Sequence, residues 1–344
     1  MSDTDSRAMH LSPSRQMMQF IWPGAMAAQG LYVAAKLGLA DLLKDGPKSV
    51  DELAHLTAAH EPSLRRLLRA LTSLGVFSQD AAGHFQNTDL SETLRTDHPE
   101  SIRAWAIFLG APFLWRSWGE LYETVLSGQP AVNRIYGGSF WAYLAAHPDD
   151  AAVFNAAMSA GSEMTVPWIL EAYDFSRFER VVDVGGGHGA LLHAILSKNP
   201  KVRGVLYDFP AVVAGAAALS SGAVAARCEV RAGDFFAGIP EGGDAYVLQR
   251  IVHDWDDDNA LRILKNCRRA IKRDGRLLVI ELVLKPSCQP DPGQEFSDVL
   301  MLTLVGGRER TESDFQALLG GAGFSLTSVI PTAGPPSIIE SQPV

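Results

Sequence analysis

The side chain best placed for chemistry is that of His253. It comes just after an apolar run that we expect to be a buried strand (244–248), and Asp254 and Trp255 follow it. A lone histidine is usually structural. One at the end of a buried strand, however, lies where a site opens, and imidazole suits proton transfer near neutral pH. We therefore expect His253 to act as a general base.

Two glutamates are candidates to assist this base. Glu281 lies in the apolar run 277–282, where a buried carboxylate is costly unless it faces a site or has a partner. Glu309 is either a second acid of the same site or a surface salt-bridge partner of Arg308 or Arg310. A carboxylate that accepts from one imidazole nitrogen fixes the tautomer of the ring and stabilises its protonated form.

A glycine-rich turn follows the apolar run 180–184 and precedes a helical pattern. Glycines there let the backbone approach a ligand, and the N–H groups that begin the helix can bind it. Gly185, Gly187 and Ala190 fit the dinucleotide pattern Gly-x-Gly-x-x-Gly/Ala. Gly185, Gly187 and Gly189 equally fit the turn of enzymes that use a nucleoside methyl donor. A plain turn between strand and helix is the third interpretation.

Two further strand ends carry residues suited to a nucleoside. Asp208 closes the next strand about 20 residues later, where an acid that binds ribose hydroxyl groups is expected. Asp234 and Phe235 follow the third strand, so the carboxylate could accept from an adenine amino group and the ring could pack on the purine. Asp234 could equally be no more than a turn or helix cap.

Aromatic residues are dense between residues 99 and 175. Most of them should form a core, but this density beside a nucleotide-binding domain also suits a flat aromatic ligand. Phe154 and Met158 are candidate walls of that binding site, since phenyl and thioether groups pack well on rings.

From residue 178 onward, strand-like and helical patterns alternate, which is typical of a doubly wound parallel sheet. We expect strands near 180–184, 203–207, 227–231, 244–248 and 276–282, a hairpin of 324–330 with 337–340, and helices near 188–198, 210–219, 257–272 and 312–322. Ligands bind such sheets at the carboxyl ends of the strands. The candidate residues therefore share one edge of the sheet.

The N-terminal part is expected to be mostly helical. A helical pair covers 17–43, and the pattern of 49–95 is typical of a winged helix with short strands at 76–78 and 84–86. Its second helix carries Arg65, Arg66 and Arg69, which either mark a DNA-recognition helix or are simply solvated. Acids outnumber bases in this part, which makes it a poor phosphate binder. We therefore expect an assembly module that binds no nucleic acid.

The composition, with 47% hydrophobic and 20% charged residues, indicates an ordinary globular protein. A net charge of −9 disfavours nonspecific nucleic-acid binding. The apolar stretch 20–43 is interrupted by Pro23, Gln29 and Lys36, so it should not span a bilayer. The three cysteines match neither a metal site nor a disulfide framework. We expect a cytoplasmic protein with no signal peptide, no membrane contact and no metal.

Several of these motifs occur together in one order and spacing. They are Asp183-x-Gly185-Gly186-Gly187-x-Gly189, Tyr207-Asp208-Phe209-Pro210, Gly233-Asp234-Phe235-Phe236, His253-Asp254-Trp255, Glu281 and Gly306-Gly307-Arg308-Glu309-Arg310. The set resembles the S-adenosylmethionine-dependent O-methyltransferases of the caffeate and hydroxyindole type, found in plant phenylpropanoid and bacterial antibiotic pathways. The resemblance covers nearly the whole chain, and the combined motifs are far more specific than the glycine turn.

The resemblance implies where the methyl donor binds. Gly185 and Gly187 would lie against its methionine part, Asp208 would hold the ribose, and Asp234 and Phe235 would hold the adenine. Plant members carry a donor-contacting lysine four residues before the base. Here that residue is Gln249, with Arg250 next to it, and the amide could still bond to the donor.

The resemblance also implies the roles around the acceptor. His253 would be the general base, oriented by Glu281 and Glu309. Met158 and Met301 match positions that hold the acceptor ring in plant members, and we add Phe154 and Asp254 to the expected acceptor contacts. The acceptor would be a small aromatic compound with a hydroxyl group. S-adenosylhomocysteine would be the other product, and a homodimer would form through the N-terminal domain.

We thus expect a class I methyltransferase with a Rossmann-like, doubly wound sheet behind a mostly helical winged-helix dimerisation domain. The expected parts are a disordered leader (1–14), the dimerisation domain (15–100), a helical linker and acceptor segment (101–175) and the donor-binding catalytic domain (176–344). Two alternatives are a winged-helix transcriptional regulator with a sensor domain and an NAD-dependent oxidoreductase. A third is a relative that has lost its base, against which His253 argues.

Overall fold

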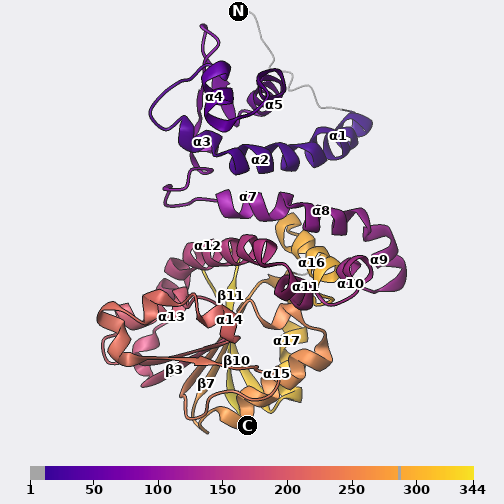
Figure 1. The fold of residues 1–344 in the computed structure, drawn as a ribbon. Helices are drawn as coiled ribbons and strands as arrows, with labels where there is room; N and C mark the ends of the chain where they lie inside the picture. The colour runs from indigo at the N-terminus through magenta and orange to yellow at the C-terminus, as the bar shows by residue number, and fades with distance from the viewer. Residues whose placement is uncertain (1–11, 286–287) are drawn as a thin grey trace, which may run out of the picture. The chain divides into compact units, whose positions relative to one another are not determined.

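The computed structural model describes residues 12–285 and 288–344. The chain divides into two compact units, the first ending at Trp115 and the second covering Arg116–Val344 (Figure 1).

The first unit is a small helical domain with one hairpin. Its elements are α1 (Pro13–Gln19), a π-helical turn (Phe20–Gly24), α2 (Ala25–Leu37), α3 (Leu39–Leu42), α4 (Val50–Thr57), α5 (Glu61–Ser73), β1 (Phe77–Gln79), β2 (Phe85–Asn87), α6 (Asp89–Glu92) and α7 (Arg103–Gly110). Helix α4 begins with a capping box: Ser49 Oγ accepts from the backbone N–H of Glu52, and the Glu52 carboxylate accepts from that of Ser49. The helices and the wing enclose one apolar core.

Small differences from the sequence-based expectation occur in this unit. The two wing strands begin one residue later than predicted, and they pair antiparallel with Phe77 opposite Asn87. Most of the expected leader lies outside the described residues, but Pro13 and Ser14 already belong to α1, where proline suits the first turn. Helix α7 packs on α2: Gln29 donates to the carbonyl of Gly110 at 3.0 Å.

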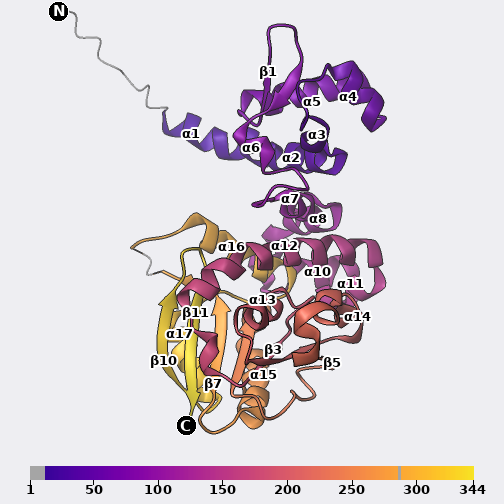
Figure 2. The same ribbon diagram turned by 90° about the vertical axis from the view of Figure 1, so that its left-hand side faces the viewer.

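A helical segment opens the second unit after α8 (Pro112–Gly119), which crosses the boundary. It comprises α9 (Leu121–Ser127), α10 (Ala131–Tyr136), α11 (Phe140–Ala146) and the long helix α12 (Pro148–Ala172). Ile169 near the end of α12 is fully buried against the sheet layer. Figures 1 and 2 show α12 lying across the sheet domain.

A seven-stranded sheet forms the centre of the second unit. Its order is β10-β11-β7-β6-β3-β4-β5. The strands are β3 (Arg180–Val184), β4 (Arg203–Asp208), β5 (Cys228–Ala232), β6 (Ala245–Gln249), β7 (Arg276–Glu281), β10 (Phe324–Pro331) and β11 (Ser337–Pro343). The first five are parallel, and β11 runs antiparallel to both of its neighbours. The predicted doubly wound sheet and its closing hairpin are confirmed.

Helices cover both faces of this sheet. On one face α15 (Asp257–Ala270) and α17 (Glu312–Gly321) bury an apolar core against the strands. On the other face α13 (Ala190–Lys198) and the end of α12 do the same. Because both faces are covered, the central strands are mostly apolar, as Val181, Val182 and Val184 in β3 illustrate, although β3 also buries Asp183.

Three elements differ from the expected pattern. The predicted helix 210–219 is two short pieces, α14 (Pro210–Val213) and a 3₁₀ turn (Ala217–Leu219), separated near Gly215. Helix α16 (Pro292–Leu304) was not predicted, although Asp291 caps it and Pro292 occupies its first turn. A parallel pair of very short strands, β8 (Val283–Leu284) and β9 (Arg310–Thr311), was also missed.

In the part of the chain that the structure describes, no helix is both long and apolar enough to cross a membrane.

Candidate functional site

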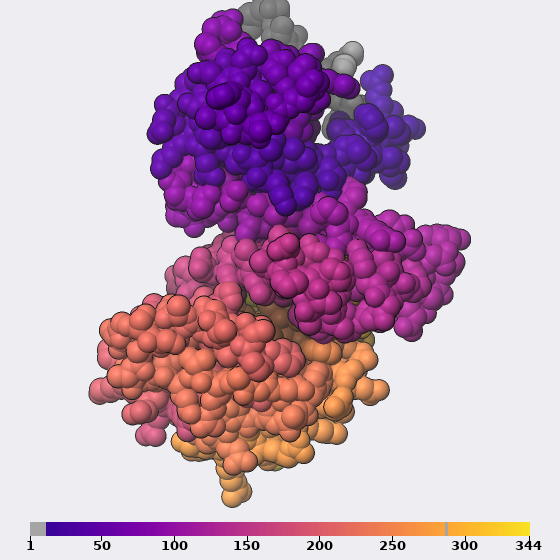
Figure 3. Space-filling model, viewed as in Figure 1, coloured from indigo at the N-terminus to yellow at the C-terminus, as the bar shows by residue number. Residues whose placement is uncertain are grey.

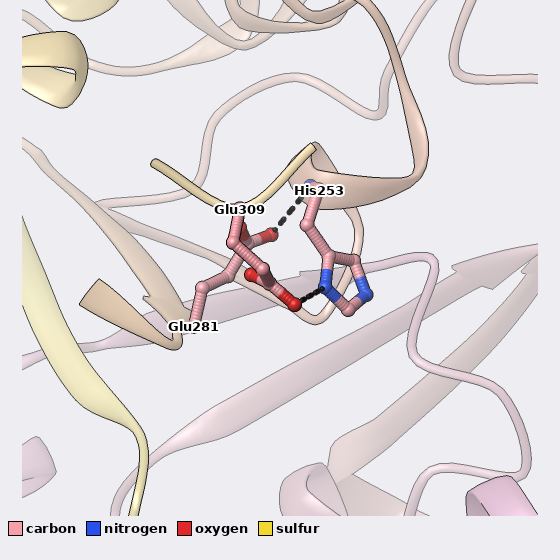
Figure 4. A group of neighbouring side chains, drawn as sticks. All are labelled: His253, Glu281 and Glu309. Carbon is pink, nitrogen blue, oxygen red and sulfur yellow. Dashed lines mark hydrogen bonds and ion pairs between the residues drawn. The ribbon is translucent and has the colours of Figure 1, made fainter. Parts of the chain in front are cut away.

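His253 lies in a buried turn at the carboxyl end of β6. The turn is 3₁₀-helical over Val252–Asp254. The ring atom Nδ1 lies 2.9 Å from Oε1 of Glu309, and both side chains are almost fully buried (Figure 4). The second ring nitrogen, Nε2, points away from both glutamates in this view and lies 3.5 Å from Oδ1 of Asp254. The imidazole is therefore held through one nitrogen.

Glu281 holds the backbone of the same turn. Its Oε1 accepts from the N–H groups of Ile251, Val252 and His253 at 3.1, 2.6 and 3.1 Å. Among the described residues its only hydrogen bonds are to these backbone groups. Three N–H groups that a strand end would leave unpaired are thus satisfied by one carboxylate oxygen.

The charges of this cluster shift the pKa of each member. Burial alone would lower the pKa of His253, but the nearby carboxylates of Glu309 and Asp254 outweigh burial and raise it to about 9. Burial raises the pKa of Glu281 to about 7 and that of Asp254 to about 6. Burial also acts to raise the pKa of Glu309, but the charge of His253 and its hydrogen bond lower it overall. The cluster therefore favours a protonated imidazole beside an ionised Glu309.

Residues far apart in sequence bring Glu309 to the imidazole. The pairing of β8 with β9 places Glu309, which directly precedes β9, next to the end of β7, where Glu281 lies. Ser297 on α16 donates to Oε1 of Glu309 at 2.7 Å. The alternative of a surface salt bridge for Glu309 does not hold, because its side chain is buried and bonds to His253 and Ser297.

The two neighbouring arginines have other partners. Arg308 pairs with Asp257 and Asp314. Arg310, which is fully buried, donates to the carbonyl groups of Val252 and Trp255 and to Asp257. Arg310 thus secures the turn of His253 from its far side.

The glycine turn lies at the neighbouring strand end. Gly187 has a φ of +61°, a conformation that favours glycine, and the space in front of it is open. Its backbone N–H donates to Oδ2 of Asp208 at 2.8 Å, while Oδ1 accepts from the N–H of Phe209. At Gly185 a side chain would collide with Ile251. Asp208 and the glycine turn are therefore side by side, as the strand order predicts.

Asp234 and Phe235 occupy the next strand end. Oδ1 of Asp234 accepts from the N–H of Phe236 at 2.8 Å, so the turn-forming role is present. The ring of Phe235 is buried among other aromatic rings, with Phe209 at 6.2 Å and Trp255 at 6.0 Å between centroids. An adenine contact for either residue stays a prediction.

The expected acceptor residues lie on α12 and α16. Phe154 packs edge-on against Trp141, and Trp141 stacks with Trp255 beside His253. Met158 accepts from the guanidinium of Arg250, with 3.3 Å between Sδ and Nη2. Met301 is buried on α16. Figure 3 shows the surface hollowed between the magenta helical segment and the orange atoms of the sheet domain.

Gln249 contacts the helical segment. Its amide nitrogen donates to the hydroxyl of Thr165 on α12 at 2.9 Å. Sequence reasoning missed Thr165, as well as Ser297 and the structural role of Arg310. Hydroxyl residues inside helices give no sequence signal of their own, and α16 was not predicted at all.

The cluster also has the composition of a metal site. One nitrogen of His253 and one carboxylate oxygen each of Glu281 and Glu309 lie within 4.8 Å of one another. Such ligands suit a divalent transition metal. The expected absence of a metal therefore remains a prediction.

Comparisons with known protein families match both parts of the chain. Residues 118–325 match an O-methyltransferase domain, and residues 21–97 match an O-methyltransferase dimerisation domain. The phenazine O-methyltransferase PhzM of Lysobacter antibioticus is 42% identical over 99% of this chain and 99% of its own length. The mitomycin biosynthesis 6-O-methyltransferase of Streptomyces lavendulae is 41% identical over 93% of this chain and 92% of its own.

A solved structure supports the same family assignment. An O-methyltransferase from neocarzinostatin biosynthesis, in complex with S-adenosylmethionine and 2-hydroxy-5-methyl naphthoic acid, is 34% identical. It superposes with a TM-score of 0.81 and covers 92% of this chain and 96% of its own. Both family models match, and relatives of about 40% identity align over nearly the whole chain. The chain therefore belongs to the S-adenosylmethionine-dependent O-methyltransferase family.

Proposed function

We propose that the protein moves the methyl group of S-adenosylmethionine to a hydroxyl group of a small aromatic compound, with His253 as the general base. The observation that carries this proposal is the buried contact between His253 Nδ1 and Glu309. Because Glu309 accepts from Nδ1, the proton of a neutral imidazole stays on Nδ1. Nε2 is then the atom that takes the proton of the acceptor.

The raised pKa of His253 suits a phenolic acceptor. A phenol has a pKa of about 10, so little of it is ionised near neutral pH. With a pKa of about 9 for His253, proton transfer from the phenol is nearly balanced. Glu309 and Asp254 then stabilise the imidazolium. Glu281 acts as a positioning residue, because it holds the backbone that carries the base.

The residues at the strand ends fit the donor. Open space at Gly187, a carboxylate at Asp208 and the ring of Phe235 follow one another along three adjacent strands. We propose that they hold the methionine, ribose and adenine parts, with Gly185, Asp234 and Gln249 beside them. When bound, the donor supplies a methyl group on a positively charged sulfur that is already activated for transfer.

We propose that Phe154, Met158, Met301 and Asp254 contact the acceptor. The related neocarzinostatin enzyme holds a hydroxylated naphthoic acid, and the names of other relatives specify small natural products. A ring nitrogen is the second candidate for the methylated atom, because a phenazine-1-carboxylate N-methyltransferase of Pseudomonas aeruginosa is 35% identical over 93% of this chain. A neutral ring nitrogen needs no base, so the buried His253–Glu309 pair favours a hydroxyl group.

An acceptor panel tests the proposed function directly. The purified protein is incubated with S-adenosylmethionine and matched phenols, anilines and ring-nitrogen heterocycles built on benzoate, naphthoate and phenazine. We expect O-methylated products from at least one phenol, detected by mass spectrometry. Methylation restricted to nitrogen would reject the hydroxyl acceptor and leave the donor assignment standing.

We also propose that the N-terminal unit forms a homodimer, with residues 15–100 for assembly, 101–175 for acceptor contacts and 176–344 for the donor. The match of residues 21–97 to a dimerisation domain supports the first of these parts. So does the exposed apolar stretch Met17–Trp22, in which Phe20 and Trp22 are 77% and 66% exposed. Apolar surface of this kind marks an interaction site.

The double substitution Phe20→Asp with Trp22→Asp should convert the dimer to a monomer, because each carboxylate would be buried without a partner in the interface. Light scattering of the full chain gives the molar mass. The control is Val344→Asp, which adds a charge at another exposed apolar residue. A double variant that stays dimeric would show that this stretch is not part of the interface.

A further inference from the structure

Arg250 has an unusual backbone conformation for its place in the fold. Its φ is +56°, and among the described residues the only other non-glycine residue with a positive φ is Ala58, which follows the end of helix α4. Arg250 instead follows a central strand. Such a conformation costs free energy and persists only where the surroundings impose it, which is frequent at functional sites.

Hydrogen bonds to strand β7 impose this conformation on Arg250. Its own N–H donates to the carbonyl of Ile280 at 3.0 Å, and the next three N–H groups donate to Glu281. Strand β7 thereby fixes four consecutive backbone groups. The consequence is a defined direction for the side chain, which extends from the sheet edge to α12.

The guanidinium lies at the expected acceptor site. Its Nη2 donates to Sδ of Met158, one of the predicted walls for the acceptor ring. A carboxylate forms a two-pronged, charge-assisted pair with a guanidinium. Burial acts to lower the pKa of Arg250, and the charges of Asp254, Glu309 and Glu281 oppose that effect. The guanidinium of Arg250 has thus already lost part of its hydration, so a carboxylate that binds it has less water to displace.

We propose that Arg250 binds a carboxylate group on the ring of the acceptor, so that the preferred acceptors are aromatic hydroxy acids. This inference rests on the proposed function and adds the substrate class. In the related neocarzinostatin enzyme, the bound compound is itself a hydroxylated naphthoic acid. The geometry would let Arg250 hold the carboxylate while His253, three residues later, receives the proton of the hydroxyl group.

The test compares each hydroxynaphthoic acid with its carboxamide, which keeps the hydroxyl group and the shape but has no charge. We expect the wild-type protein to favour the acid by about 10- to 100-fold in kcat/KM, the range of one charge-assisted pair. Arg250→Gln should lose that preference, so that the ratio of the two kcat/KM values falls to about one. Arg250→Lys should recover part of it, because an ammonium keeps the charge but not the fork.

Two controls make the result specific. Arg250→Gly removes the side chain, and glycine suits the positive φ. It therefore replaces the glutamine variant in the test if that variant does not fold. Arg308→Gln removes a half-exposed guanidinium that pairs with Asp257 and Asp314, and it should keep the preference for the acid.

Calorimetry with S-adenosylhomocysteine separates the remaining outcomes. Unchanged affinity in the Arg250 variants supports the proposal. A large loss of affinity would instead place Arg250 on the donor and overturn it, as would an equal fall in rate for acid and amide. A wild-type protein that binds the homocysteine product but methylates no aromatic hydroxyl refutes the proposed function, and this inference with it.

Discussion

Replacing His253 with glutamine should lower kcat by roughly 10²- to 10⁴-fold, the contribution of a positioned general base. The affinity for S-adenosylhomocysteine should stay at the wild-type value. The backbone of the turn remains bonded to Glu281, so the fold around residue 253 is preserved. Turnover measured with saturating donor and acceptor, together with calorimetry, gives both quantities. Turnover at the wild-type level would remove His253 from the mechanism.

The pH dependence of kcat/KM identifies the group that acts as the base. A base must be neutral to accept a proton, and the nearby carboxylates raise the pKa of His253 to about 9. The value of kcat/KM should therefore rise roughly tenfold per pH unit below pH 9 and level off above it. In Glu309→Gln the carboxylate that raises this pKa is gone, so the plateau should begin at a lower pH. The matched control is His55→Gln, which changes an exposed histidine on α4 of the N-terminal unit.

Substituting Asp208 with alanine should weaken the binding of S-adenosylhomocysteine by about 10²- to 10⁴-fold. The carboxylate would otherwise accept from two ribose hydroxyl groups, and hydrogen bonds to a charged group contribute about 1.5 to 3 kcal/mol each. The same carboxylate accepts from the N–H of Gly187, so its loss also releases the glycine turn. Calorimetric titration measures the change, and unchanged affinity would show that the ribose lies elsewhere.

Asp244 provides the control for this experiment. Its two carboxylate oxygens accept from the N–H groups of Glu179 and Arg180, both at 2.6 Å. The chemistry matches that of Asp208, but Asp244 precedes β6 and Arg180 begins β3, so the contact lies at the opposite end of the sheet. Asp244→Ala should cost stability in a thermal melt and leave donor affinity unchanged.

The sheet, and the edge of it that the candidate site residues share, were predictable because they depend on local patterns. Apolar runs marked β3, β4 and β6. The polar residues at the ends of these strands, Asp208 and His253 among them, had to share one edge once the strands were parallel. The glycine turn alone left three interpretations open. The family matches decide between them in favour of the methyl donor and against a nicotinamide cofactor or a regulator.

The partner of the base was harder to predict. His253 and Glu309 are 56 residues apart, and their contact depends on β8, β9 and α16. Two-residue strands have no periodicity, and the apolar residues of α16 did not stand out from a loop. Sequence also indicates that a buried carboxylate such as Glu281 needs a partner, but not whether that partner is an imidazole or a backbone N–H. The structure assigns it to the backbone.

The way Glu281 holds its turn has a consequence for how this scaffold can diverge. The carboxylate bonds to the main chain of Ile251, Val252 and His253, which every residue type except proline provides. The hydrogen bonds that hold the backbone of the turn therefore do not depend on the side chain at position 253. An ancestor could exchange its base for another residue in a single step without first rebuilding the loop. Chemistry that needs no base is thus one substitution away from chemistry that does.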